Sequence, residues 1–354
     1  MLVSFIIPAY NAANTIVRCL DSICDLSLKR NEFEVIVIDD CSTDETVPII
    51  EQYQKQIIEN EIVRVEENLI FLKQQENHRQ GAARNRGVKI AKGKFICFVD
   101  ADDAVTEKVV AAIYLAQKKQ TDMTAFHYAY VKESGVITNE ADRLSFENEQ
   151  IFTGIEMQNE HPYWSSAPWG YIYRKEFLEE VNYPFCEGVL YEDSDFVAVH
   201  LYHAKRMVYS PELGYFAYYR EGSTTHSLTY KNLADYLLLG TRMMTLYERV
   251  MCERADDIEK ESVNRFAEGV LEGACFNVEQ SCRRLLKLDS LNEVRAYYER
   301  IDERVNRLDI VANKSYRSYY WNVWTGLCMR HKMFVIFFIS FVIPIYHVAM
   351  KLKA

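Results

Sequence analysis

The stretch Lys94-Phe-Ile-Cys-Phe-Val-Asp-Ala-Asp-Asp103 is the part of the sequence that decides the fold. Its apolar run from Phe95 to Val99 is nearly continuous, which is typical of a short strand buried on both faces of a sheet. The run stops at three carboxylates, those of Asp100, Asp102 and Asp103. Carboxylates this close repel one another unless a cation neutralises them, and oxygen ligands suit Mg²⁺ or Mn²⁺. The alternative is an acidic turn that caps a helix beginning near Thr106.

The composition excludes some classes of protein. A chain of 354 residues can hold one large domain or two. Its 41 Lys and Arg residues against 51 Asp and Glu residues give a net charge of −10, which argues against a nucleic-acid-binding protein. The nine cysteines form no CxxC pair, so we expect reduced thiols in a cytosolic protein. Because the N-terminus leads directly into an apolar strand, we expect no secretory signal.

Two upstream strands also end in polar residues. Leu2 to Ile7 is an apolar run that stops at Pro8 and leads to Ala9, Tyr10 and Asn11, and Asn11 is expected to cap the next helix. Glu34 to Asp40 is a second buried strand that ends in two carboxylates, and turn residues then begin a helix that runs to about Gln54.

Further elements continue the alternation of strands and helices. Ile62–Val65 is predicted as a weak third strand, and Arg79 to Ala91 as a helix that Gly93 ends as a C-cap glycine. This order, with continuous apolar strands, predicts a mainly parallel, doubly wound sheet. Right-handed crossovers bring the carboxyl ends of such strands to one edge, where ligands of α/β proteins bind. The polar strand ends therefore favour a nucleotide or metal site over unrelated acidic turns.

The helix from Arg79 brings a cation close to these carboxylates. Small residues at Gly81 and Gly87 allow it to pack closely on the sheet. Arg84 could then reach a phosphate or an aspartate, although a surface arginine is the alternative.

Four motifs together carry a resemblance to a known family: Ser4–Asn11, Glu34–Thr46, Gly81–Gly87 and Phe98–Asp103. In order and spacing they resemble the family 2 glycosyltransferases, over residues 1–229. Those enzymes are inverting, use nucleotide-sugar donors and have the GT-A fold, a Rossmann-like, mainly parallel sheet flanked by helices.

The resemblance implies a donor site and a metal site. It places Asp100 and Asp102 in the metal-binding DxD motif, with Asp103 adjacent, and Mn²⁺ or Mg²⁺ as the cofactor. Asp40, with Asp39, would face the nucleotide base. The other residues expected around the donor are Pro8, Ala9, Tyr10, Asn11, Arg84 and Ala101.

A second acidic pair is the candidate for catalysis. Gly188 permits a turn, after which Glu192 and Asp193 begin a helix. The helix macrodipole favours acidic residues there, but a carboxylate beside a sugar site could also deprotonate an acceptor hydroxyl. By the resemblance this pair carries the catalytic base, usually its second member, which is Asp193. Downstream, Arg220 could close over a diphosphate, or belong to a polar surface loop.

The C-terminal part has a different pattern. From Tyr230 to residue 330, apolar stripes at helical spacing predict a helical extension. Residues 333–350 contain no Asp, Glu, Lys or Arg, are interrupted by Pro344 and are flanked by cations. A single span, an interfacial anchor and a helix buried against the catalytic domain are all open, and the flanking cations favour membrane contact.

These patterns predict a catalytic domain over 1–229, with a nucleotide-sugar half (1–104) and an acceptor half (105–229). A helical extension (230–330) and a membrane-associating segment (331–354) follow. The expected activity is inverting transfer of a sugar from a nucleotide-diphosphate sugar, such as a UDP-sugar, to a hydroxyl of a glycan or lipid-linked acceptor. The enzyme would act in polysaccharide biosynthesis at the inner face of the cell membrane.

Two alternatives stay open. A sugar-nucleotide nucleotidyltransferase would carry a Gly-rich loop with Arg and Lys after the first strand, where Pro8–Asn11 has neither glycine nor cation. A non-catalytic, membrane-tethered carbohydrate-binding protein is the other alternative.

Overall fold

The computed structural model describes residues 1–59, 68–147, 149–162, 164, 166–219, 230–253 and 260–285. The chain divides into two compact units, Met1–Glu221 and Gly222–Ala354. Four predicted features lie outside the described residues: the strand Ile62–Val65, the loop residue Arg220, the extension from 286 to 330 and the segment 333–350.

The first unit is built on a nine-stranded sheet with the strand order β3-β2-β1-β4-β8-β6-β9-β5, and β7 pairs with β6. In the first half, β1 pairs in parallel with β2 and β4, and β2 in parallel with β3. In the second half, β8 is antiparallel to β4 and β6, β9 is parallel to β6, and β5 is antiparallel to β9. The strands are β1 (Val3–Ala9), β2 (Phe33–Asp39), β3 (Leu69–Lys73), β4 (Phe95–Phe98), β5 (Ala104–Val105), β6 (Met123–Lys132), β7 (Ile137–Glu140), β8 (Tyr171–Arg174) and β9 (Met207–Tyr219).

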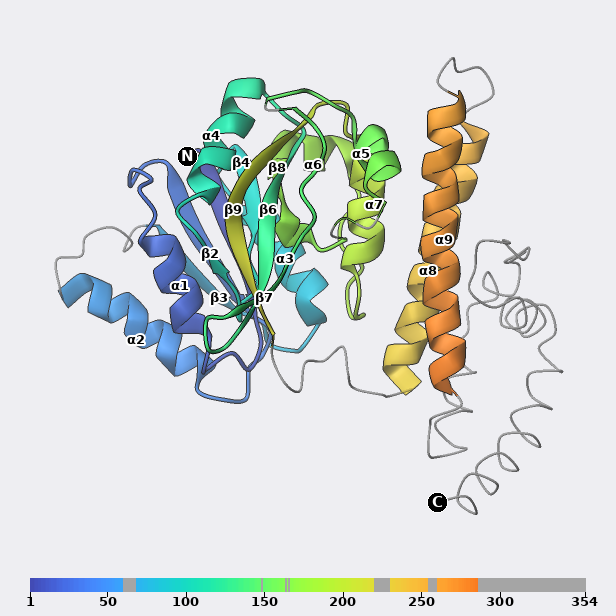
Figure 1. Cartoon of the computed structure of the whole chain (residues 1–354). Coiled ribbons are helices and arrows are strands. Elements are labelled where there is room, and N and C mark those ends of the chain that lie inside the picture. Colours follow the sequence, from blue (N-terminus) through green and yellow to red (C-terminus); the bar gives the residue numbers. More distant parts are fainter. Residues whose placement is uncertain are drawn as a thin grey trace. The chain divides into compact units, whose positions relative to one another are not determined.

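Helices cover both faces of this sheet (Figure 1). The crossovers put α1 and α2 on one face and α3 on the other, as right-handed connections require when the strand order reverses after β3. The helices of this unit are α1 (Ile16–Cys24), α2 (Thr46–Glu59), α3 (Arg79–Ile90), α4 (Val109–Lys119), α5 (Gly154–Glu160), α6 (Lys175–Val181) and α7 (Asp193–His203), with a 3₁₀ turn at Pro168–Gly170.

The central strands explain why their sequences are continuously apolar. Every residue of β1, β2 and β4 is buried, because helices cover these strands on both faces. The predicted α/β sheet flanked by helices is therefore confirmed. The mainly parallel pairing that was expected holds in the first half, and the antiparallel pairs of the second half make the sheet mixed.

The described residues also contain a strand that was not predicted, β3 at Leu69–Lys73. Two local predictions were wrong. Asn11 does not cap a helix, because α1 begins at Ile16 after Thr15; instead the Asn11 side chain accepts a hydrogen bond from the Thr43 N–H at 2.8 Å. Gly93 is not a C-cap, since α3 ends at Ile90 and its C-cap residue is Ala91, with φ −57°.

Gly93 is required for a different reason. A Cβ atom at this position would lie 2.5 Å from the backbone nitrogen of Ser4. The chain can therefore pass β1 this closely only with glycine.

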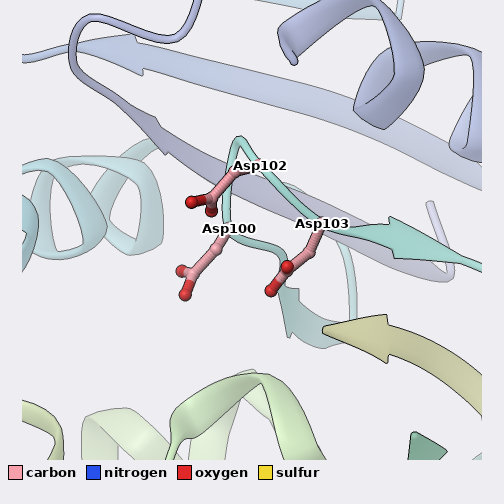
Figure 2. Close-up of side chains that lie close together, drawn as sticks. All are labelled: Asp100, Asp102 and Asp103. Atoms are coloured by element: carbon pink, nitrogen blue, oxygen red, sulfur yellow. The ribbon is translucent and has the colours of Figure 1, made fainter. Parts of the chain in front are cut away.

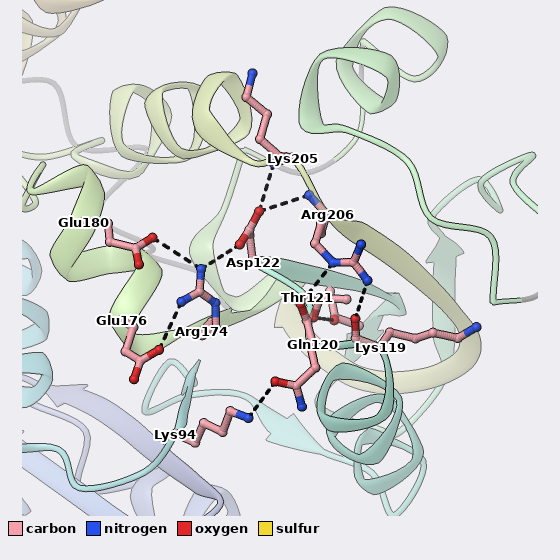
Figure 3. Close-up of polar contacts among 11 residues, drawn as sticks. Lys94, Lys119, Gln120, Thr121, Asp122, Arg174, Glu176, Glu180, Lys205 and Arg206 are labelled. Carbon is pink, nitrogen blue, oxygen red and sulfur yellow. Dashed lines mark hydrogen bonds and ion pairs between the residues drawn. The ribbon is translucent and has the colours of Figure 1, made fainter.

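A polar network lies at the end of the sheet opposite Asp100 (Figure 3). The carboxylate of Asp122, just before β6, accepts hydrogen bonds from the Arg174 side chain at 2.8 Å and from the backbone N–H groups of Lys205 and Arg206 at 2.9 and 3.0 Å. Arg174 is the register partner of Phe95, at the start of β4, whereas Asp100 follows the end of that strand. This network joins the ends of three strands away from the acidic residues.

The second unit contains the helix pair α8 (Tyr230–Cys252) and α9 (Lys260–Leu285). Leu239, Val250, Phe266 and Ala267 are among its fully buried residues. This agrees with the amphipathic helices expected after Tyr230. Among the described residues, no helix combines the length and the apolar character needed to cross a membrane.

Candidate active site

The polar ends of β1, β2 and β4 meet at one edge of the sheet. Ala9 is the register partner of Asp39, and Ile6 that of Phe98, in parallel pairs. The N–H of Asp40 donates to the carbonyl oxygen of Ala9 at 2.8 Å. Asp40 and the acidic turn after β4 therefore lie at the same edge, as the sequence predicted.

The turn after β4 presents three carboxylates (Figure 2). Asp100, Asp102 and Asp103 each offer an oxygen, and these oxygens lie within 4.8 Å of one another. Asp100 and Asp102 are partly exposed and Asp103 is buried. A set of carboxylate oxygens at this spacing fits a hard divalent cation such as Mg²⁺ or Mn²⁺.

Asp103 is held differently from its neighbours. Its carboxylate accepts hydrogen bonds from the Tyr215 hydroxyl at 2.7 Å and the Tyr218 N–H at 2.8 Å. Burial, and then the charges of Asp102 and Asp100, raise the pKa of Asp103. Asp103 therefore connects the turn to β9, while Asp100 and Asp102 are better placed to bind a cation.

Arg84 connects this turn to the second acidic pair. Its guanidinium is buried and forms an ion pair with Asp100 at 2.7 Å and another with Glu192, and it also donates to Gln80 at 2.9 Å. Burial by itself lowers the pKa of Arg84, but Asp100 and Glu192 outweigh it and raise the pKa. The predicted contact of Arg84 with an aspartate is therefore present, together with one to Glu192 that the sequence did not suggest.

Glu192 and Asp193 lie at the N-terminus of α7. Glu192 is buried and Asp193 is half-buried. Burial raises the pKa of Asp193 to about 6, and Arg84 partly opposes this. Burial likewise raises the pKa of Glu192, with Arg84 again opposing it. Because the Glu192 carboxylate is committed to Arg84, Asp193 is the better candidate for exchanging a proton with a substrate.

α3 shapes the segment that leads to this pair. The Asn85 side chain donates to the Phe185 carbonyl oxygen at 3.0 Å and accepts from the Phe185 N–H at 2.9 Å. A Cβ atom at Gly81 would lie 2.6 Å from the carbonyl oxygen of Cys186. The motif Gly81-Ala-Ala-Arg-Asn85 indicates in the sequence that this helix packs closely. The sequence alone does not reveal that it packs against Phe185 and Cys186.

The residues predicted around the nucleotide differ in how far they are exposed to solvent. Pro8 and Ala9 are buried, as is Ala101, whereas the Tyr10 side chain is 47% exposed. Asn11 lies partly exposed, and its N–H donates to Ser42 Oγ at 2.9 Å.

Asp39 and Asp40 are both buried. Asp39 accepts from the Ser42 N–H at 3.1 Å, and Asp40 accepts from the His78 N–H at 2.8 Å. Burial raises the pKa of Asp40, and the His78 N–H partly offsets this. The two aspartates therefore fix the loops on either side of the strand end.

Aromatic residues that could have faced a sugar pack in the core instead. Trp169 is buried and stacks on Tyr215, with ring centroids 4.7 Å apart. Trp164 contacts the rings of Tyr128 and Tyr209.

Comparison with known proteins identifies the family. The profile described as Glycosyl transferase family 2 matches residues 4–181. This range includes α3 and all the predicted site residues from Pro8 to Asp103. The chain belongs to glycosyl transferase family 2. It is a glycosyltransferase, and its sheet and helices have the GT-A fold.

Relatives of this family 2 chain include several bacterial glycosyltransferases. It is 35% identical to the poly(ribitol-phosphate) beta-glucosyltransferase of Bacillus spizizenii over 126 residues, 35% of the chain and 18% of that protein. It is 26% identical to the uncharacterized glycosyltransferase YibD of Escherichia coli over 262 residues, 72% of each. It is 28% identical over 226 residues, 63% of the chain, to poly(ribitol-phosphate) beta-N-acetylglucosaminyltransferase TarS of Staphylococcus aureus, and those residues are 36% of TarS.

A solved structure has the same fold. The crystal structure of S. aureus TarS 1–349 in complex with UDP-GlcNAc superposes with a TM-score of 0.63, at 22% identity, over 93% of this chain and 89% of that one.

Proposed function

We propose that this family 2 chain is an inverting, metal-dependent glycosyltransferase. It moves a sugar from a nucleoside diphosphate sugar, probed first as a UDP-sugar, to a hydroxyl of a glycan or lipid-linked acceptor. The observation that carries the proposal is the buried Arg84, whose ion pairs to Asp100 and Glu192 join the DxD turn and the acidic pair in one site. The UDP-GlcNAc in the TarS crystal structure supports the choice of donor.

In this proposal Asp193 is the catalytic base. Its carboxylate takes the proton of the acceptor hydroxyl while that oxygen forms a bond to the anomeric carbon. The bond from the anomeric carbon to the diphosphate breaks, and its electron pair leaves with the nucleoside diphosphate. Glu192 and Arg84 keep the charge around Asp193 balanced, because each neutralises the other and both are buried.

Asp100 and Asp102 would hold Mn²⁺ or Mg²⁺. The cation, when bound, would offset negative charge on the diphosphate. Asp39 and Asp40 shape the loops beside which the nucleotide base would lie, and the exposed Tyr10 would cover its face.

The acceptor side of the proposal rests on the sequence and the relatives. The names of the Bacillus and Staphylococcus relatives describe transfer to poly(ribitol-phosphate), which is a polymeric acceptor. A lipid-linked or polymeric acceptor near the membrane would suit the apolar segment 333–350.

The test uses the purified full-length chain with a panel of nucleotide sugars, with and without Mn²⁺. Release of nucleoside diphosphate and transfer of labelled sugar are both measured. Asp193→Asn should lower turnover by about 10²- to 10⁴-fold, and Asp102→Ala should abolish the metal-dependent rate. Glu149→Gln, which breaks only two surface ion pairs, with Lys118 and with Lys119, is the control and should match wild type. Wild-type rates in both site variants would overturn the proposal.

A further inference from the structure

Arg18, in the first turn of α1, meets three separate parts of the fold. Its Nη2 donates to the carbonyl oxygen of Asp102 at 2.6 Å, and its Nη1 pairs with the Glu133 carboxylate at 2.7 Å. The guanidinium carbon lies 3.6 Å from the centre of the Tyr218 ring. Both terminal nitrogens and one face of the guanidinium plane therefore have defined partners.

Together with hydrogen bonds from β9, these contacts hold the backbone of the acidic turn in place. The N–H of Asp100 donates to the Tyr215 hydroxyl at 3.1 Å, and Asp103 is held by that hydroxyl and by the Tyr218 N–H. Arg18 holds the backbone of Asp102, which lies between them. The Asp102 carboxylate projects from this backbone, so the donor on the carbonyl oxygen helps to hold the carboxylate beside those of Asp100 and Asp103.

An arginine suits this position better than a lysine. A charged N–H donor forms a shorter and stronger hydrogen bond than a neutral one. The planar guanidinium of Arg18 donates to Asp102 and Glu133 together, while one of its faces stacks on the Tyr218 ring. A lysine keeps the charge, but its compact ammonium cannot stack and bond in the same arrangement.

We propose that Arg18 is a positioning residue for glycosyl transfer: it fixes the Asp102 backbone against the end of β9, and so sets the metal affinity of the DxD turn. This rests on the proposed role of Asp102 as a metal ligand. Arg18 touches neither donor nor acceptor in this proposal, and acts only through Asp102 and Tyr218.

The experiment compares Arg18→Lys with wild type in direct Mn²⁺ binding, followed by titration calorimetry without donor, and in metal-dependent donor hydrolysis. The dissociation constant for Mn²⁺ should rise by the same factor as the metal requirement of the rate. The Mn²⁺ concentration that gives half-maximal rate should rise about tenfold, as expected for loss of one charged hydrogen bond. At saturating Mn²⁺ the rate should recover most of its wild-type value. In Arg18→Ala, added guanidinium should restore part of the metal affinity, whereas methylammonium should not.

Two controls separate positioning from general stability. Glu133→Gln removes one partner of Arg18 but leaves the bond to Asp102, so its metal requirement should stay within about twofold of wild type. Arg174→Lys makes the same chemical change in the network at the opposite end of the sheet. It should lower the melting temperature without changing the Mn²⁺ requirement.

The outcomes distinguish this proposal from the one on which it rests. Wild-type Mn²⁺ requirements in both Arg18 variants, with Asp102→Ala inactive, would overturn the positioning role alone. Metal-dependent activity that survives Asp102→Ala would overturn the proposed function instead. If Arg18→Ala does not fold, the Mn²⁺ requirement of Arg18→Lys, read together with its melting temperature, decides whether Arg18 has the positioning role.

Discussion

The Arg84 guanidinium is a single buried cation that serves carboxylates from two distant parts of the chain. Glu192 lies 108 positions away in sequence, and Asp100 lies 16 positions away. Without this cation, the buried Glu192 would face the partly exposed Asp100 and the half-buried Asp193 as like charges. Breaking such a group by removing one partner is far more costly than losing a surface ion pair.

Arg84→Met should therefore strongly destabilise the fold. We expect the free energy of unfolding to fall by about 3–5 kcal/mol, because the substitution leaves a buried, uncompensated carboxylate. Urea unfolding followed by circular dichroism measures this. Adding Glu192→Gln to the variant should recover part of the loss, since it removes that charge. A loss below about 1 kcal/mol, the usual value of a surface pair, would show that the pair is not stabilising.

The pKa of Asp193 gives a prediction for the pH dependence of activity. Burial raises this pKa to about 6, and a general base works only when it is deprotonated. The rate should therefore be level above about pH 7 and fall roughly tenfold per unit well below the pKa. Initial rates of kcat/KM between about pH 5 and 8 test this, with circular dichroism at each pH to exclude unfolding. A rate that stays constant down to about pH 5 would contradict the assignment of Asp193 as the base.

At the residue scale, the sequence predicted which side chains gather but not how they pair. The carboxylates at Asp40 and Asp100 were expected at one edge because each follows a strand of a parallel sheet. The ion pair from Arg84 to Glu192 could not be predicted, because it joins two halves of the chain through tertiary packing. The contacts of Arg18 and Tyr215 with the acidic turn were missed for the same reason.

At the scale of elements, α3 and β9 carry the contacts that build the site. α3 presents Gly81, Arg84 and Asn85 to residues 185–192, and β9 holds the acidic turn through Tyr215 and Tyr218. The position of α3 was predictable from small residues at helical spacing. The position of β9 was not, since its partner β6 is parallel to it while β8 and β5 are antiparallel to their neighbours.

Gly81→Ala tests the close approach of α3 to the acidic pair. The new Cβ would lie 2.6 Å from the Cys186 carbonyl oxygen and 3.1 Å from Glu192 Cγ, so the backbone before Glu192 must move. We expect donor hydrolysis to fall at least about tenfold, since small displacements of catalytic groups are costly. Steady-state assays of the purified variant measure this.

Gly273→Ala in α9 is the matched control. Its Cβ would meet the Met243 Cε atom at 2.5 Å, at the end of a flexible side chain that can move aside. Alanine also favours a helix interior by about 0.5–1 kcal/mol over glycine. This variant should therefore keep wild-type activity and at least wild-type stability. Equal activity in both variants would mean that the contact at Gly81 does not shape the site.

At the scale of the whole molecule, the candidate site lies in the first unit, Met1–Glu221. The unit that holds its acidic residues also provides their supports, Arg18 on α1, Arg84 on α3 and Tyr215 on β9. The role of the second unit and of the apolar segment 333–350 is therefore separate from donor chemistry in our proposal.

Removal of residues 331–354 tests the membrane-associating segment. The full chain should float with vesicles that contain anionic lipid, because the segment is apolar and flanked by cations. The shortened chain should stay with the soluble fraction and keep its rate of donor hydrolysis. Neutral vesicles are the control for the electrostatic part. Equal flotation of both chains would place the membrane contact elsewhere.

The bond from the Tyr215 hydroxyl to Asp103 has a consequence for biosynthesis. These residues lie 112 positions apart, and the same hydroxyl accepts the Asp100 N–H. During translation the N-terminal strands leave the ribosome first, yet the DxD turn can gain these bonds only after the strand carrying Tyr215 has emerged and docked. Nascent chains that stop short of that strand would contain every aspartate of the motif and still be unable to bind the cation as the finished protein would.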